Sequence, residues 1–221
     1  MATFKREWFK SETDYVKANY LVGHNPKVKL SEIATTYDDI KFKNGNFSKL
    51  IIDEKIGYWT AYEADTLDCQ KIEFARVFWH YFMKGANVKH VINVNGKTGH
   101  TGSCFQIPNL LTFEANSLGV WADSICYDCN KLKSFIAKDA SLAENLSLVG
   151  CTALEKIILT GIVRSFDIHY STALSEQALI ELFNSIGVVT TTQTITLGST
   201  LLAKLTDEDK KIATDKGWTL A

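Results

Sequence analysis

A spacing of 22 residues recurs through the middle of this 221-residue chain. It separates Leu110, Leu132 and Leu154 from one another, and it separates Cys104 from Cys126. Such a period is typical of proteins in which one small unit stacks on copies of itself, because a single unit cannot bury its own apolar face. The spacing therefore predicts a solenoid in which each copy forms one coil.

Three columns describe the repeat, and one further inward position follows them. The columns are Phe82, Cys104, Cys126, Leu148 and Ile168; Gly85, Ile107, Cys129, Cys151 and Ser171; and Val88, Leu110, Leu132, Leu154 and Leu174. The further inward position is held by Val91, Phe113, Phe135 and Ile157. We expect repeats from about residue 86 to residue 174, each with a short strand that begins at the leucine column.

Two copies carry a family motif. Residues 125–132 read Ile-Cys-Tyr-Asp-Cys-Asn-Lys-Leu and residues 147–154 read Ser-Leu-Val-Gly-Cys-Thr-Ala-Leu. Both resemble the A-F-x-x-C-x-x-L box of BspA-like leucine-rich repeats, whereas the copies at 107–110 and 171–174 lack the cysteine. The tail from Ser175 to Ala221 is also similar to the ending of leucine-rich-repeat surface proteins of Bacteroidetes and their phages, as judged from Thr-Ile-Thr-Leu-Gly at 194–198 and Leu-Thr-Asp-Glu-Asp at 205–209 through Gly217-Trp218. This resemblance implies a binding or structural protein rather than an enzyme.

The expected fold is therefore α/β, a short right-handed leucine-rich-repeat solenoid with unlike caps. Residues 1–63 are expected to form an N-terminal attachment or capping module with helical and β elements. Residues 64–174 would form the solenoid with a leading helix, and residues 175–221 an α/β C-terminal cap. The leading helix is predicted over 66–84, because Leu67, Phe74 and Phe78 recur there at helical spacing.

Cap signals divide the C-terminal segment into alternating elements. Ser175 is a good N-cap for a helix whose apolar face covers residues 178–186 and which ends at Gly187. A strand-prone run follows over 188–197. A capping box at Thr206 then begins a second helix, which ends before Gly217.

Composition excludes several classes of partner. The net charge of -1 gives no support for nucleic acid as a partner. No stretch of about 18 apolar residues is present, so we expect no membrane insertion. The first ten residues spread their charges and lack the apolar core of a secretory signal, so no signal peptide is expected in this chain.

The five cysteines are an odd number, which argues against a disulfide framework. Four of them lie in the repeat columns, where buried thiols can stack from coil to coil. Cys126-Tyr-Asp-Cys129 is the only C-x-x-C pair, and a single pair is weak evidence for zinc or redox chemistry. We therefore expect no metal and no cofactor.

Other chemical motifs are incomplete. Gly96-Lys97-Thr98 resembles the end of a phosphate-binding loop, but Val91 stands where that loop needs its first glycine. Cys104 near His100 is the only suggestive nucleophile and base, and Cys104 falls in a buried column. No catalytic residue is assigned.

One surface column is a candidate interface. The residue after each inward position of the repeat strand should face outward, and these residues are Ile92, Glu114, Ile136 and Ile158. The three isoleucines could form an apolar stripe, rimmed by Lys89, His90, Lys133, Ser134, Glu155 and Lys156. The alternatives are that the register is off by one or that the caps cover the stripe.

Two functions follow from the resemblance. The first is a structural or host-contact protein of a phage particle, bound to other virion proteins or to itself as a homo-oligomer. The second is a bacterial cell-surface adhesin that binds a host protein or glycan. An enzyme acting on surface glycan would need a carboxylate pair in a cleft, which the sequence does not indicate.

Overall fold

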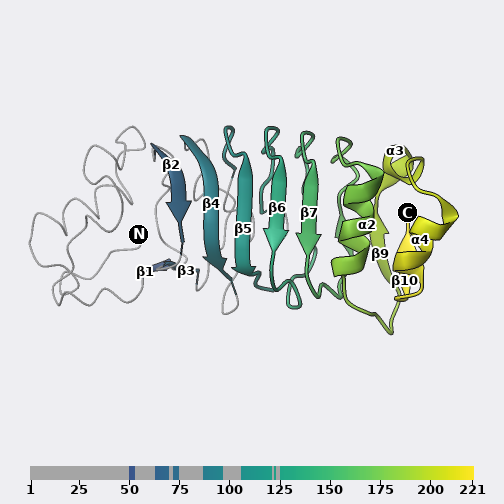
Figure 1. Ribbon diagram of the computed structural model, residues 1–221. Coiled ribbons are helices and arrows are strands. Elements are labelled where there is room, and N and C mark those ends of the chain that lie inside the picture. The colour runs from purple at the N-terminus through teal and green to yellow at the C-terminus, as the bar shows by residue number, and fades with distance from the viewer. Residues whose placement is uncertain are drawn as a thin grey trace, which may run out of the picture.

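The computed structural model describes residues 50–52, 63–69, 72–74, 87–96, 106–120, 122 and 125–221. These residues form a mixed α/β structure in which all paired strands run parallel (Figure 1). The strands are β1 (Leu50–Ile52), β2 (Glu63–Asp68), β3 (Ile72–Phe74), β4 (Asn87–Asn95), β5 (Thr112–Ser117), β6 (Ser134–Ala137), β7 (Lys156–Leu159), β8 (Phe166–Asp167), β9 (Gln193–Thr196) and β10 (Trp218–Leu220). The helices are α2 (Glu176–Ser185), α3 (Gly198–Leu202) and α4 (Asp207–Thr214).

The main sheet has five strands in the order β2-β4-β5-β6-β7, which is also their order in the chain. β2 and β7 lie at its two ends, so the described part of this sheet does not close into a barrel. Two smaller sheets accompany it, β1-β3 and β10-β9-β8. In Figure 1 the five strands stand side by side in a row that ends at α2.

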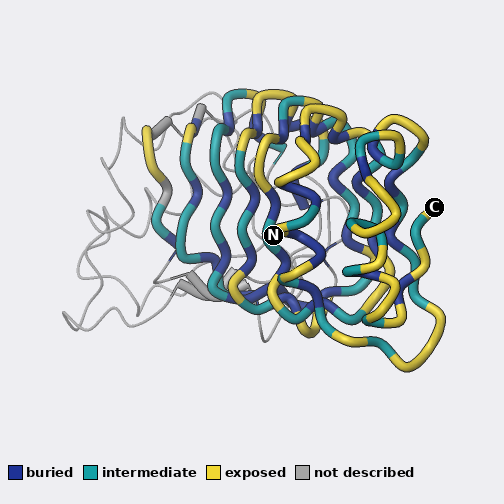
Figure 2. Tube along the Cα trace, turned by 45° about the vertical axis from the view of Figure 1, so that its right-hand side comes forward, coloured by how far each residue is buried: buried dark blue, intermediate teal, exposed yellow. Residues whose placement is uncertain are grey.

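The 22-residue spacing is the register of the main sheet. Phe113 pairs with Phe135 across β5 and β6, and Phe135 pairs with Ile157 across β6 and β7. Each repeat therefore places corresponding residues at the same height of neighbouring strands. Figure 2 shows the result as buried positions that recur from strand to strand.

The predicted columns form the core. Every described member of the three columns and of the further inward position is buried, namely Val88, Val91, Ile107, Leu110, Phe113, Cys126, Cys129, Leu132, Phe135, Leu148, Cys151, Leu154, Ile157, Ile168, Ser171 and Leu174. Burial of large apolar side chains contributes roughly 1.5–3 kcal/mol each. The column assignment is therefore confirmed for these residues, while Phe82, Gly85 and Cys104 lie outside the described part of the chain.

The predicted helix over 66–84 is wrong wherever the structure describes it. Thr66 and Leu67 lie in β2, where they pair with His90 and Val91 of β4. Residues 72–74 form β3, which pairs with β1. Short apolar runs fit helical and extended patterns alike, and here the parallel ladder supplies backbone partners from strands distant in the sequence. The sheet thus begins one strand earlier than the columns indicated, and residues 75–84 lie outside the described part.

A β-bulge interrupts β4. The pairs His90–Thr112 and Val91–Phe113 are followed by Val94–Ala115, so β4 carries one residue more than β5 between them. Asn93 lies in this bulge with a φ of 58°. Asparagine tolerates the left-handed region better than most residues, because its short polar side chain bonds locally. The bulge changes which β4 side chains face outward.

Tight turns let neighbouring repeats approach each other closely. Gly150 has a φ of 80°, and a Cβ at this position would lie 2.8 Å from the Cα of Asp128 in the preceding coil. Asp128 N donates to the carbonyl of Val149 at 2.9 Å. A residue other than glycine would therefore force the two turns apart, besides adopting a strained backbone.

The C-terminal segment contains the predicted alternation of helices and strands. The Ser175 hydroxyl accepts from the N–H of Ala178, and Thr206 and Asp209 form a reciprocal capping box at the start of α4. Two features differ from the prediction: α3 was not expected, and β9 covers only residues 193–196 of the strand-prone run 188–197. Consecutive β-branched residues favour a strand, but pairing with β8 and β10 begins only at Gln193.

Helix α2 lies beside β7 and is held there at its C-terminal end. Leu159 N donates to Ser185 Oγ, and Gly161 N donates to the Ser185 carbonyl. The Lys216 ammonium donates to the carbonyls of Phe183, Asn184 and Ile186 at 2.8, 2.8 and 2.9 Å. A cation at these last carbonyls satisfies groups that the helix leaves unpaired. Helix α2 therefore bounds the main sheet next to β7.

Candidate functional site

The outward face of the main sheet is the candidate functional site. Glu114, Ile136 and Ile158 are half-buried on neighbouring strands, whereas the residues that precede them are buried. This alternation places the three side chains on the side of the sheet opposite the core. In Figure 1 the row of strands faces the viewer, and none of the described helices crosses it.

The structure brings together only part of the predicted isoleucine stripe. Ile136 and Ile158 are partners in the β6–β7 register. Glu114 is the next residue in that row, on β5. Ile92 pairs with Asp68 on the other side of β4, and the bulge that follows shifts the register toward β5. The stripe is thus a pair of isoleucines, with Ile92 separated from it by Glu114.

Of the predicted rim residues, His90, Ser134 and Lys156 share one register row of the sheet, and Lys89, Lys133 and Glu155 are exposed one residue before them. Most of the six are paired with the adjacent repeat. Lys89 Nζ lies 2.9 Å from Asp65, and Lys133 Nζ lies 3.1 Å from Glu155. Each of these exposed pairs contributes little to stability. The Lys89 ammonium holds the pKa of Asp65 below its usual range, through a hydrogen bond and through its charge.

A second row of rim residues carries hydroxyl and imidazole groups. His90 Nδ1 lies 2.8 Å from Thr112 Oγ1, and Thr112 is followed in register by Ser134 and then by Lys156. Thr66 begins this row on β2 as the partner of His90. Lys156 has no ion pair among the described residues, and its charge faces solvent next to α2.

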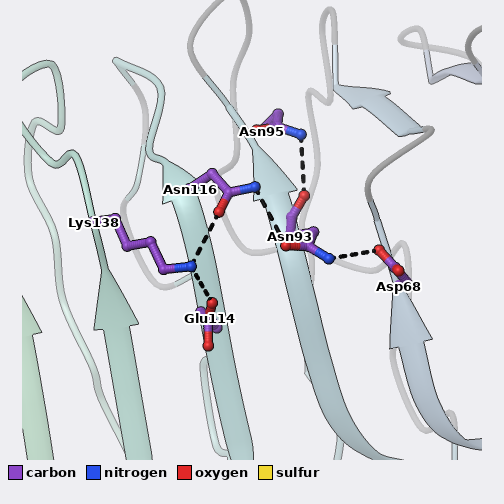
Figure 3. A network of polar contacts seen from close by, with 6 residues as sticks. All are labelled: Asp68, Asn93, Asn95, Glu114, Asn116 and Lys138. Carbon is purple, nitrogen blue, oxygen red and sulfur yellow. Dashed lines mark hydrogen bonds and ion pairs between the residues drawn. The ribbon is translucent and has the colours of Figure 1, made fainter.

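A polar network that the sequence analysis missed crosses the C-terminal ends of the strands (Figure 3). Asn93 Nδ2 donates to Asp68 Oδ1 at 3.0 Å, and Asn116 Nδ2 donates to Asn93 Oδ1 at 3.4 Å. Lys138 Nζ donates to Asn116 Oδ1 at 3.4 Å and forms an ion pair with Glu114. Separations of 22 to 25 residues between hydrogen-bonded partners are the signal that would have found this network.

The network fixes side chains that would otherwise sample several rotamers. Amide groups present both donors and acceptors, and Asn116 uses its nitrogen toward Asn93 and its oxygen toward Lys138. Asn93 and Asn116 are both half-buried, so their remaining donors and acceptors face outward. Groups ordered before binding lose less entropy when a ligand arrives. The face is therefore suited to recognition by hydrogen bonds rather than by net charge.

The thiols lie inside the stack, away from this face. Ile107 N donates to Cys129 Sγ at 3.4 Å, and the Cys151 thiol donates to the carbonyl of Cys126 at 3.1 Å. Burial raises the pKa of Cys151 far above its usual range. A buried, protonated thiol is a poor nucleophile and a poor metal ligand. Cys104, the cysteine near His100, lies outside the described residues.

An aspartate at the end of β8 orients one histidine. His169 Nδ1 lies 2.6 Å from Asp167, and the ring of Tyr170 packs on the imidazole with centroids 3.7 Å apart. Nucleophilic catalysis also needs a hydroxyl or thiol bonded to the imidazole. No such group bonds to His169 among the described side chains. We assign no catalytic role to this pair.

The described residues contain neither a metal-binding cluster nor a membrane-spanning helix. In the described part of the chain no group of three or more His, Cys, Asp or Glu side chains is arranged to hold a metal ion. None of the described helices has the length and apolar character needed to cross a bilayer. Of the loop-like motif at 96–98, only Gly96 is described, and its N–H donates to the Ser117 carbonyl.

Comparison with known proteins gives no relative. No protein family, no curated protein and no solved structure matches this chain.

Proposed function

We propose that this protein is a non-enzymatic binding and structural protein, built as a short leucine-rich-repeat solenoid, whose outward sheet face contacts a partner. The observation that carries the proposal is the open face of the five-stranded sheet, where outward side chains are pre-ordered by cross-coil pairs. A stacked scaffold presents an extended surface without needing a pocket. The parallel strands and their 22-residue register are what a solenoid requires.

The more specific proposal is a component of a phage particle, bound to other virion proteins or to itself. It rests on the resemblance of residues 125–132 and 147–154 to BspA-like repeats. The alternative is a bacterial cell-surface adhesin that contacts a host protein or glycan. Both proposals assign the contact to the same sheet face. They differ only in whether the protein belongs to a phage particle or to a bacterial cell surface.

Two measurements test the particle proposal. Mass spectrometry of purified phage particles from a strain that produces this protein should detect it at a constant copy number. Light scattering after gel filtration should give a mass above that of one 24.7 kDa chain if the protein assembles with itself. A strict monomer that is absent from purified particles would contradict the virion assignment. Surface labelling of intact bacteria would then test the adhesin.

A matched pair of variants tests the contact face. Ile136→Asp places a charge between Glu114 and Ile158 on the outward face. Leu142→Asp places the same charge on a side chain that is 41% exposed and lies in the turn beyond β6. We expect only the first to weaken incorporation into particles or adhesion to cells. Equal behaviour of the two variants would contradict the assignment of the sheet face.

A further inference from the structure

The chemistry of the sheet face indicates a class of partner, if the proposed function holds. We infer that the face binds a linear, uncharged polysaccharide that lies across the strands. Four observations carry this inference: the neutralised charges, the rows of amide and hydroxyl groups, the isoleucine pair at the β6–β7 end of those rows, and the absence of interface anchor residues on the described strands.

Charge on the face is largely cancelled within it. Asp65 neutralises Lys89, Glu155 neutralises Lys133, and Glu114 neutralises Lys138. Partners of high charge are attracted by an excess of the opposite charge, which this face lacks over β2 to β6. Lys156 is the exception, and it lies at the edge beside α2. In the second polar row, the Asp68 carboxylate accepts from the neutral amide of Asn93. A neutral partner therefore meets little charge that is not cancelled within the face.

Two polar rows run across strands β2 to β6. The first row contains Thr66, His90, Thr112 and Ser134, and the second contains Asp68, Asn93, Asn116 and Lys138. Ile136 lies between the two rows on β6; beside it, Ile158 lies at the same height on β7 and Glu114 at the same height on β5. Sugar rings in a linear chain have hydroxyl groups along their edges and C–H groups on their faces. Hydroxyl and amide side chains match the edges as donors and acceptors.

The spacing of the rows is regular. Neighbouring strands lie about 4.8 Å apart, so equivalent groups recur at that interval along each row. A chain of identical sugars also presents its hydroxyl groups at a constant interval of similar size. Consecutive sugars could therefore make the same contacts on consecutive strands, as expected for a polymer rather than a single small ligand.

Residues typical of protein interfaces are missing from the described face. The outward positions of β2, β4, β5, β6 and β7 in the described residues include no Trp, Tyr, Phe, Met or Arg. These side chains dominate the binding energy of protein interfaces. A protein partner is thus the less favoured occupant, and it remains an outcome of the test.

Affinity electrophoresis of the full chain provides the test. Native gels would contain soluble mixed-linkage β-glucan or galactomannan as neutral probes, and polygalacturonate as the acidic probe. We expect at least one neutral probe to slow the protein, with little change when salt is added, because screening does not weaken uncharged contacts. Ile136→Asp should bind about tenfold more weakly, since it leaves a desolvated charge, and Leu142→Asp should bind as the unaltered protein does.

The outcomes separate the polysaccharide proposal from the proposed function. Retardation only by polygalacturonate, lost in salt, would overturn the neutral class. Retardation that is equal in both variants would place binding off the sheet face and overturn the inference. If no probe slows the protein but Ile136→Asp still abolishes incorporation into particles or adhesion, the contact face stands and the neutral-polysaccharide inference is overturned. Circular dichroism of both variants checks that each is folded.

Discussion

Phe113 and Phe135 stack on one another on neighbouring strands, with ring centroids 4.9 Å apart and ring planes 12° apart. They are partners in the β5–β6 register, and both are fully buried. An aromatic pair of this kind adds about 0.5–1.5 kcal/mol beyond the area it buries. The repeat thus stabilises the stack by placing one ring on the next.

Phe135→Ala should therefore be strongly destabilising. Phe135 is packed between Phe113 and Ile157, so truncation leaves a cavity that neither neighbour can fill without moving its strand. We expect a loss of about 3–5 kcal/mol in the free energy of unfolding, measured by urea denaturation followed by circular dichroism. Leu142→Ala, at a side chain that is 41% exposed, is the control and should cost far less. Similar losses in the two variants would contradict the packing role.

Two serines should respond to alanine with opposite sign. The Ser171 hydroxyl is buried and has no hydrogen-bond partner among the described residues, so Ser171→Ala should leave stability unchanged or raise it by about 1 kcal/mol. Ser185 Oγ accepts from Leu159 N and donates to the Leu182 carbonyl. Ser185→Ala should therefore lower stability by about 1–2 kcal/mol. Thermal and urea unfolding of both variants measure the difference, and a marked loss in Ser171→Ala would reveal a partner for that hydroxyl.

The Cys151 thiol should be protected in the folded protein. Its pKa is raised by burial, so the nucleophilic thiolate is scarce near pH 8. Iodoacetamide labelling followed by peptide mapping should leave Cys151 unmodified in the native state and modify it in guanidinium chloride. Rapid native labelling would show that the coil opens locally or that the thiol is accessible.

The raised pKa of Cys151 also predicts how the stability of the protein changes at alkaline pH. The folded state keeps the Cys151 proton more tightly than the unfolded state, whose thiol has a pKa of about 8.5. This contribution is fully present below that value and is lost as pH rises above it. Cys151→Ala should therefore lose less stability between pH 8 and pH 10 than the unaltered protein does. An identical pH dependence in the two proteins would argue against the shift.

The capping box of α4 predicts the opposite dependence in acid. Hydrogen bonds from the Thr206 hydroxyl and backbone N–H lower the pKa of Asp209. The resulting stability is present above the unfolded pKa of an aspartate, about 3.9, and is lost as pH falls through the lower folded value. Thr206→Ala should cost about 1 kcal/mol at neutral pH and should reduce this acid dependence. Thr214→Ala, at the exposed end of α4, is the matched control, and urea titrations at several pH values provide the measurement.

Some elements of the structure could be predicted from the sequence, and others could not. The columns around Leu110, Leu132 and Leu154 were predictable, because each copy repeats the same burial requirement. The capping signals at Ser175 and Thr206 were also sufficient, since a cap acts within one turn of its helix. The helix predicted over 66–84 failed because residues 63–68 pair with a strand that begins more than 20 residues later, at Asn87.

The candidate surface was predictable only in part. Alternation along a strand placed Ile136 and Ile158 on the outward face. Glu114, which the sequence already placed in this column, separates Ile92 from them. The bulge at Asn93 brings Asn93 into contact with Asp68 and Asn116. A bulge depends on how two strands pair, and the sequence of one strand does not specify it.

By itself, the sequence determined what recurs: the 22-residue period, the identity of the buried columns and the ends of α2 and α4. These features arise from local geometry and from the need of each repeat to bury the same side chains. Only the tertiary structure decided where the sheet begins, which residues lie side by side on its open face, and how Lys216 holds α2. Those relationships join groups that are far apart in the chain, so their hydrogen bonds and contacts exist only once the coils have stacked.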